Sequence, residues 1–251
     1  MTPNQRPVHV AVLYALDIEA GSLVDRLADV STLRGEQLTV RLGHLDEQRV
    51  AVAITGAGDA RAERGTEAII DAHQPRWVIA AGLSGGLTPE VQRHAIVMAD
   101  RIVNPAGDTL TTGLRIEADE LKRFGDVHLG RVLSWPNVVR RVEDKRELGE
   151  RYDARAVDME SFAVADTCRR RGVGMICVRA IGDPVDEQLP ADVERLLQKR
   201  PGAAQWGAAA AAVLRRPGAV KDFWRLRENT ILTAERLAEV LVGVIPQLPA
   251  P

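Results

Sequence analysis

Cysteine is scarce in this chain of 251 residues, which contains only Cys168 and Cys177. Their spacing matches no metal-binding or redox motif, so the cytoplasm, a reducing compartment, is the predicted location. The five histidines are scattered, and none stands at metal-ligand spacing from another histidine or a cysteine. The sequence therefore predicts no metal site.

An excess of charge of one sign and long apolar runs are also missing. The 33 basic and 35 acidic residues give a net charge of −2, which offers no reason to expect nucleic acid as a partner. No apolar run is long enough to span a membrane, and the first residues, M-T-P-N-Q-R-P, lack the apolar core of a signal peptide. We therefore expect no integral membrane segment.

The chain does contain an alternation of apolar, strand-like runs with helix-like segments. Strands are predicted at residues 9–16, 38–42, 50–54, 77–82, 95–103 and 175–181. Helices are predicted at residues 19–27, 60–73, 137–152 and 161–171. Because continuous apolar strands alternate with helices, the pattern is typical of an α/β fold with a mostly parallel sheet.

Neither an internal repeat nor a low-complexity linker divides the chain. One domain is predicted over residues 8–190. Residues 191–251 are predicted to form a helical C-terminal extension packed on the same domain, with an Ala-rich helix at 208–214 and a longer helix at 220–242.

Acidic side chains follow several predicted strands at the points where the strands end. Glu19 comes just after the first strand, Glu160 follows the short segment A-V-D-M, and Asp183 follows the run R-A-I-G. A Gly-rich segment, G-L-S-G-G-L at 82–87, ends the strand that starts at Trp77. Ligands of open α/β sheets bind beyond the carboxyl ends of the strands. We therefore expect three carboxylates and one Gly-rich loop to share a crevice.

Each acid also has a structural interpretation when it is taken alone. Glu19 could cap the helix that it begins, and Asp183 could be a turn residue before a proline. For Glu160 the structural alternative is an ion pair with Arg171. Asp158 is expected to be structural, paired with Arg155 or Arg169.

The run T-G-A-G-D-A-R at 55–61 is similar to half of a dinucleotide-binding fingerprint. It has Arg61 where the third glycine should stand, so a Rossmann cofactor site is rejected. No cofactor is expected.

Five motifs occur along the chain in a fixed order. They are A-L-D-I-E (15–19), T-G-A-G (55–58), A-G-L-S-G-G-L (81–87), A-V-D-M-E (156–160) and V-R-A-I-G-D (178–183). Together they resemble the purine nucleoside phosphorylase and nucleosidase superfamily, nearest to its methylthioadenosine/S-adenosylhomocysteine nucleosidase branch. The resemblance implies a three-layer α/β/α sandwich around a central mixed, mostly parallel twisted sheet. It also implies a homo-oligomer, a dimer or higher, and a small purine nucleoside as the binding partner.

The resemblance assigns roles to matching residues. Asp183 matches the acid that protonates N7 of the purine, and Glu19 matches the acid that orients or deprotonates the attacking water. Glu160 matches the carboxylate that binds the ribose hydroxyls, with Met159 packed on the sugar. Further substrate-binding positions implied by the match are Gly82, Leu83, Ser84, Val138 and Val139. Arg179 matches a structural arginine near the acid.

The chemistry of N-glycosidic cleavage requires the same three acids. The sugar passes through an oxocarbenium-like state, which a nearby carboxylate stabilises. The leaving purine needs a proton from an acid of raised pKa, and the nucleophile needs a base. We therefore predict cleavage of an adenosine-like nucleoside, with or without a modified 5′ position.

Two departures from the family pattern bear on the reaction. Leu83 stands where many nucleosidases have Ser, and Ser84 follows it. The segment 20–23 lacks the arginine with which phosphorylases bind phosphate, which favours hydrolysis, although Arg61 or Arg64 could supply a phosphate site. The alternatives are a phosphorylase, a nucleosidase for a lipid-linked (hopanoid-type) adenosyl compound, and a non-catalytic nucleoside-binding protein. Retention of all three acids argues against the last.

Overall fold

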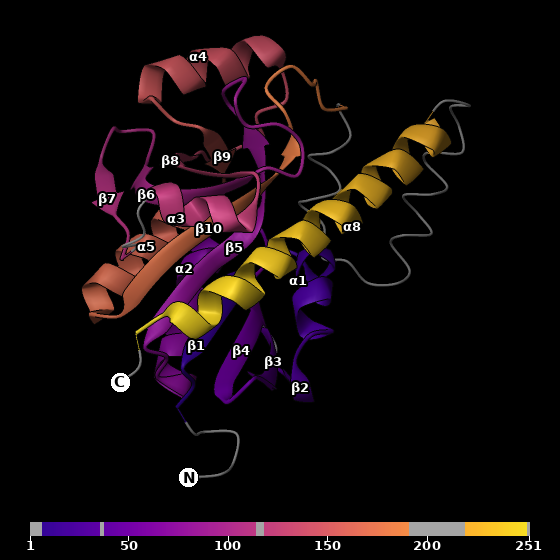
Figure 1. The fold of residues 1–251 in the computed structure, drawn as a ribbon. Helices are drawn as coiled ribbons and strands as arrows, with labels where there is room; N and C mark the ends of the chain where they lie inside the picture. The colour runs from indigo at the N-terminus through magenta and orange to yellow at the C-terminus, as the bar shows by residue number, and fades with distance from the viewer. Residues whose placement is uncertain (1–6, 36–37, 114–117, 191–218, 250–251) are drawn as a thin grey trace.

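A computed structural model describes residues 7–35, 38–113, 118–190 and 219–249 of the chain (Figure 1). The Ala-rich helix predicted at 208–214 lies outside these residues. None of the helices in the described ranges combines the length and the apolar character needed to cross a membrane.

Ten strands form one mixed sheet in the described part of the chain, in the order β10-β6-β8-β9-β5-β1-β4-β3-β2, with β7 paired to β6. Parallel pairs join β1 to β4 and β5, β5 to β10, and β8 to β6 and β9. The other neighbours are antiparallel. The strands are β1 (Val10–Tyr14), β2 (Ala28–Arg34), β3 (Thr39–Leu45), β4 (Gln48–Ile54), β5 (Trp77–Gly86), β6 (Ile96–Val103), β7 (Thr109–Thr111), β8 (Val127–Ser134), β9 (Ala156–Asp158) and β10 (Gly174–Asp183).

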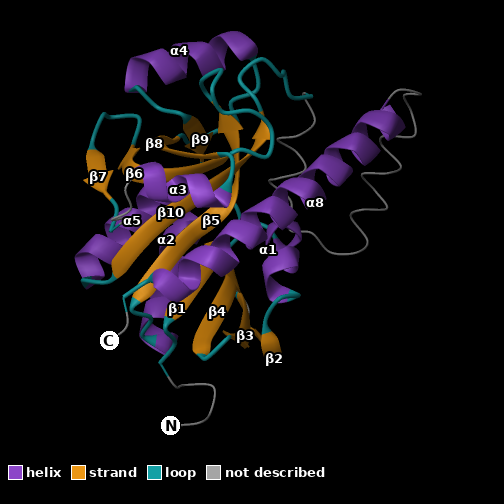
Figure 2. Cartoon of the chain, in the orientation of Figure 1, coloured by secondary structure: helices purple, strands orange, loops and turns teal. Residues whose placement is uncertain are grey.

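Helices cover both faces of this sheet, which gives the predicted three-layer sandwich (Figure 2). One face is covered by α1 (Asp17–Val24) and α8 (Ala219–Val244), and the other by α2 (Asp59–His73) and α5 (Ser161–Arg171). The remaining short elements are α3 (Ala118–Leu121), η2 (Lys122–Phe124), α4 (Val142–Tyr152) and η3 (Ile245–Gln247).

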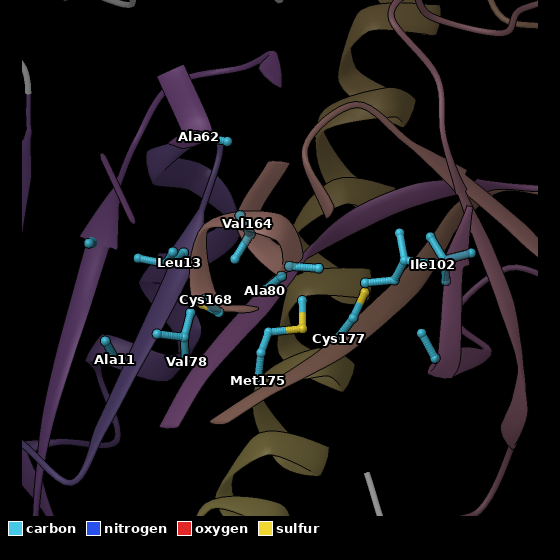
Figure 3. Close-up of a cluster of buried hydrophobic side chains, with 14 of the residues drawn as sticks. Ala11, Leu13, Ala62, Val78, Ala80, Ile102, Val164, Cys168, Met175 and Cys177 are labelled. Atoms are coloured by element: carbon cyan, nitrogen blue, oxygen red, sulfur yellow. The ribbon is translucent and has the colours of Figure 1, made fainter. Parts of the chain in front are cut away.

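The alternation of side chains along β1 explains the two cores. Val10 and Val12 pack in the cluster that contains α1 and α8, whereas Ala11 and Leu13 pack in the cluster that contains α2 and α5. All four side chains are almost completely buried. Figure 3 shows the second cluster, where Cys168 of α5 lies near the strands. A strand buried on both faces has no polar alternation, which is why it reads as a continuous apolar run.

The helix predicted at 220–242 is present as α8, and it packs on the sheet. Leu237, Ala238 and Leu241 are fully buried in the same cluster as Val10 of β1. The described part of the C-terminal extension therefore supplies core side chains to the sandwich. The boundary placed after residue 190 stays a prediction.

Part of the sheet closes on itself. Strand β10 pairs with both β5 and β6, and β9 pairs with both β5 and β8, so β5, β9, β8, β6 and β10 form a closed circuit. Helix α4 packs beside this circuit through Leu148 and Tyr152, which contact a small cluster with Leu87, Leu133 and Val157. The circuit brings the ends of β5, β9 and β10 together.

The predicted helix at 137–152 is partly wrong, because α4 begins only at Val142. Val138 and Val139 lie in the preceding loop, and Arg141 just before the helix is still extended. β-Branched residues lose side-chain freedom in a helix, so this pair of valines disfavours an earlier start.

Three strands escaped prediction for identifiable reasons. Strand β2 lies at the sheet edge with exposed side chains, so it carries no apolar pattern. Strand β7 has only three residues. Strand β8 is interrupted by His128, Gly130 and Arg131, which break its apolar run.

Candidate active site

A pocket opens where β1, β5, β9 and β10 end, at their carboxyl ends. Its cavity of about 210 Å³ is much larger than the ~30 Å³ share of one water molecule, so it can hold a small organic ligand. The pocket is lined by Ala15, Leu16, Glu19, Ala57, Leu83, Ser84, Gly85, Asn137, Val138, Val139, Val157, Asp158, Met159, Glu160, Gly182, Asp183, Leu189, Asn229 and Thr230.

Eight of the nine predicted site residues therefore line one pocket, and the ninth, Gly82, lies directly behind it. A Cβ atom at Gly82 would approach Nη1 of Arg179 to 2.5 Å and Oε1 of Glu19 to 3.4 Å. A side chain at this position would displace the arginine, which explains why the strand has a glycine here.

Glu19 is buried in the first turn of α1, and its two carboxyl oxygens accept hydrogen bonds from two different segments. Its Oε2 atom accepts a hydrogen bond from the backbone N–H of Leu16 (2.9 Å), which caps the helix as the structural interpretation expected. Its Oε1 atom accepts one from the N–H of Leu83 on the Gly-rich segment (3.0 Å). Burial raises the pKa of Glu19, and these two hydrogen bonds oppose the rise.

Glu160 lies between β9 and α5, and its carboxyl group lines the pocket. Its Oε1 atom accepts a hydrogen bond from the N–H of Gly58 in the T-G-A-G turn (2.8 Å). The carboxyl group is not paired with Arg171, which instead forms an ion pair with Asp71. Burial and the neighbouring charge of Asp158 raise the pKa of Glu160 to about 7.

Asp158 is structural, as predicted, but its partner differs from the prediction. Its Oδ2 atom lies 2.5 Å from Nη2 of Arg179, and it also accepts a hydrogen bond from the hydroxyl of Ser161. Neither Arg155 nor Arg169 takes this place, and Arg169 pairs with Asp166 instead. Arg179 is adjacent to Asp158 only through the tertiary fold, so sequence proximity suggested the wrong arginines.

Asp183 ends β10 with its side chain half-buried at the edge of the pocket. Burial raises the pKa of Asp183 to about 6, and Lys145 opposes the rise because its Nζ atom lies 2.6 Å from Oδ2. A Cβ atom at Gly85 would lie 3.3 Å from the same oxygen, so this glycine leaves room for the carboxyl group. Lys145 was not foreseen, since in the run V-E-D-K-R-E-L it looks like one charge among many on an exposed helix.

Apolar side chains form the walls between the three acids. Leu83 contacts Glu19 through its backbone N–H, and Met159 directly precedes Glu160 in the sequence. Val138 and Val139 come from the loop before α4. The hydroxyl of Ser84 is buried and finds no hydrogen-bond partner among the described residues. An unpaired buried hydroxyl in a pocket is suited to bind a polar ligand atom.

Most of the lining residues that were not predicted lie within the five motifs, but others come from segments outside them. Asn229 and Thr230 come from α8, and Leu189 from the segment after β10. These residues have no local motif that marks them. No lysine or arginine occurs among the described residues that line the pocket, so its polar character is acidic and neutral.

The comparisons with known proteins agree with this architecture. The family model of the phosphorylase superfamily matches residues 9–216. The chain is similar to the 5′-methylthioadenosine/S-adenosylhomocysteine nucleosidase of Staphylococcus haemolyticus, with 22% identity over 209 residues that cover 75% of this chain and 92% of the relative. The nucleosidase of the same name from Geobacillus thermodenitrificans is 25% identical over 214 residues, covering 75% and 89%.

Solved structures share the fold at lower identity. The 5′-methylthioadenosine/S-adenosylhomocysteine nucleosidase of Helicobacter pylori, with butyl-thio-DADMe-Immucillin-A, superposes with a TM-score of 0.74 and 18% identity, covering 97% of this chain and 99% of that chain. The futalosine hydrolase of Helicobacter pylori gives a TM-score of 0.70 and 17% identity, covering 98% and 99%.

The raised pKa of Glu160 predicts a pH-dependent gain of stability in Glu160→Gln. A carboxyl group whose folded pKa lies above its unfolded value of 4.5 costs stability as pH rises through about 7, because the folded state must lose the proton. The variant should therefore melt higher than the wild type at pH 8, with a smaller difference at pH 5. Each kcal/mol corresponds to roughly 2–4 °C for a domain of this size.

Thermal unfolding of both proteins between pH 4.5 and 8.5 measures this difference. Glu150→Gln, an exposed residue on α4, is the control and should show no such trend. A pH-independent difference for Glu160→Gln would mean that the carboxyl group keeps an ordinary pKa.

Proposed function

This chain belongs to the phosphorylase superfamily, and from the chemistry of its pocket we propose that it hydrolyses the N-glycosidic bond of an adenosine-like purine nucleoside. The observation that carries the proposal is the convergence of Glu19, Glu160 and Asp183 on one pocket whose described lining has no basic side chain. The nucleosidase names of the relatives support a substrate with a modified 5′ position.

Asp183 is the proposed general acid. With a pKa of about 6, roughly a tenth of the molecules carry the proton at pH 7. An acid poised near neutrality can deliver its proton to N7 of the purine as the bond breaks and can be protonated again for the next cycle. The apolar walls from Val138 and Val139 are proposed to hold the base against this carboxyl group.

Glu160 is proposed to bind the ribose hydroxyls, with Met159 packed against the sugar. Its Oε1 atom is already fixed by the N–H of Gly58, so the carboxyl group is held in place before a ligand arrives. Hydroxyl donors and the positive charge that develops on the sugar both favour the ionised carboxylate. The negative charge that burial makes costly would thus be stabilised in the transition state.

Glu19 is proposed to orient or deprotonate the attacking water. Backbone N–H groups hold both of its oxygens, which fixes the carboxyl plane at the pocket wall. Its raised pKa suits a group that accepts a proton. A phosphate dianion needs fixed positive charge or several N–H donors, and Glu19 would repel it.

Substrate contacts from the Gly-rich segment are proposed at Leu83 and Ser84, with Gly82 providing the space behind them. The buried hydroxyl of Ser84 is available for a polar atom of the ligand. The cytoplasm remains the proposed location, and no cofactor is required for the reaction.

The protein is also proposed to be a homo-oligomer, a dimer or higher. Exposed apolar side chains at Ile231 and Leu232 of α8 supply surface that such contacts would cover. Light scattering at micromolar concentration should give at least twice the mass of the 27.4 kDa chain, and a monomer at that concentration would contradict the proposal.

Asp183→Asn should lower kcat by about a hundredfold or more while ligand affinity stays close to that of the wild type, because the amide cannot donate the acid proton. Release of free base from adenosine and from 5′-methylthioadenosine measures kcat, and calorimetry measures binding. Asp186→Asn, an exposed acid three residues away, is the matched control and should be fully active. Wild-type turnover by Asp183→Asn would exclude Asp183 as the acid.

Hydrolysis predicts free base and free sugar as products, at a rate that added phosphate leaves unchanged.

Glu19→Gln should lose about a hundredfold or more in kcat and still bind nucleoside, because the amide cannot act as a base. Asp17→Asn, on the same helix and paired with Arg41, is the control. Accumulation of ribose 1-phosphate in proportion to base would show phosphorolysis and direct attention to Arg61 and Arg64.

A further inference from the structure

A fully buried lysine stands directly behind the proposed general acid. Lys145 on α4 has no solvent exposure, and its Nζ atom lies 2.6 Å from Oδ2 of Asp183. The same ammonium donates hydrogen bonds to the carbonyl oxygens of Pro184 and Glu187, both at 2.8 Å. A third and longer hydrogen bond, of 3.5 Å, goes to the backbone carbonyl oxygen of Asp183 itself, and the contact with Oδ2 is an ion pair.

This arrangement fixes the side chain and the backbone of the acid together. Helix α4 is held against the closed strand circuit by Leu148 and Tyr152, so Lys145 projects from a packed element. From there it contacts the carboxyl group of Asp183 and the two carbonyls that follow it. An ammonium that backbone carbonyls hold in place, and that pairs with Oδ2, restricts rotation of the carboxyl group.

The two carboxyl oxygens of Asp183 have different surroundings. Oδ2 is shut off from solvent beside Lys145, whereas the side chain as a whole keeps 16% of its surface exposed, and Asp183 lines the pocket. The exposed part therefore lies on atoms other than Oδ2. Holding Oδ2 toward α4 directs the other oxygen, Oδ1, toward the pocket, where a leaving base would be protonated.

Burying an ammonium is costly unless it is paired and hydrogen-bonded, as Lys145 is. A second cation near the acid, in the described part of the chain, is Arg93, which contacts the carbonyl oxygen of Gly182 and the carboxylate of Glu187. The charge of Arg93 also lowers the pKa of Asp183, but less than that of Lys145, whose ammonium lies 2.6 Å from the carboxyl group.

We propose that Lys145 is a positioning residue for the general acid: it clamps Oδ2 of Asp183 so that Oδ1 presents the proton to the leaving base. This inference rests on the proposed function. The positive charge of Lys145 also favours the ionised form of Asp183 and so limits how far burial raises the pKa of the acid. Loss of Lys145 should misplace the carboxyl group and raise its pKa together.

The test uses Lys145→Gln in the full chain, because glutamine removes the charge and keeps amide donors for the carbonyls. We expect kcat for adenosine to fall by about tenfold or more with little change in KM. The alkaline limb of the pH profile, which reports loss of the acid proton, should move upward by about one pH unit or more. Lys145→Arg retains the charge and should restore the position of this limb.

A substrate that needs no acid separates positioning from general damage. 4-Nitrophenyl β-D-ribofuranoside has a leaving group that departs without a proton, so Lys145→Gln should hydrolyse it at nearly the wild-type rate. In an Asp183→Asn background, Lys145→Gln should cause no further loss of kcat with adenosine, because both changes remove the same function.

The matched control is Arg131→Gln, which loosens the other end of α4 without touching Asp183. Arg131 donates a hydrogen bond to the carbonyl oxygen of Tyr152 (2.7 Å), the last residue of the helix. The Arg131→Gln variant should have a lower melting temperature than the wild type and an unchanged pH profile. Should Lys145→Gln fail to fold, Lys145→Met replaces it with the same expected result.

The outcomes distinguish the inference from the proposed function. An unchanged alkaline limb in Lys145→Gln, or equal losses with adenosine and the nitrophenyl riboside, would overturn the role of Lys145 while hydrolysis still depends on Asp183. Full activity of Asp183→Asn would instead overturn the proposed function and the inference with it. A readout that needs no turnover is the ¹³C carboxyl resonance of Asp183, whose titration should move to higher pH in Lys145→Gln.

Discussion

The guanidinium of Arg179 allows several acidic side chains to lie buried around one pocket. It pairs with Asp158 at 2.5 Å and donates to the hydroxyl of Ser161 at 2.9 Å. Its charge also lowers the pKa values of Glu19 and Glu160 against the effect of burial. A buried carboxylate without a nearby cation would take up a proton or unfold the site. Position 82 is a glycine because of this arginine, since a side chain there would displace the guanidinium.

The strand topology decides which acids meet at this pocket. Parallel pairing of β1, β5 and β10 places the carboxyl ends of all three strands on the same side of the sheet. Glu19 follows the first of these strands and Asp183 ends the third, although the two residues are 164 positions apart in the sequence. Strand β9 closes the circuit and sets Glu160 beside them.

The charged side chains around the pocket form two groups, the cations that hold the acids and the acids that face the ligand. Arg179 and Lys145 are buried behind the carboxyl groups and hold them, while the carboxyl groups face the cavity. Because these two cations lie behind the acids, they stabilise the carboxylates but cannot contact an anionic ligand in the pocket. This division is consistent with a superfamily member that uses water as its nucleophile, since phosphate would need the cations in the pocket itself.

The sequence by itself determined the parts of this protein that depend on local pattern. Continuous apolar strands such as β1 and β5 predicted the α/β fold, and the motifs at strand ends predicted that Glu19, Glu160 and Asp183 would share a crevice, which the structure places in one pocket. The tertiary structure alone decided the partners of these acids. Asp158 meets Arg179 of another strand, and Asp183 meets Lys145, because strand pairing and helix packing bring them together. A charged residue on a helix has the same local pattern whether it faces water or a buried carboxylate, so only the packed fold distinguishes the two.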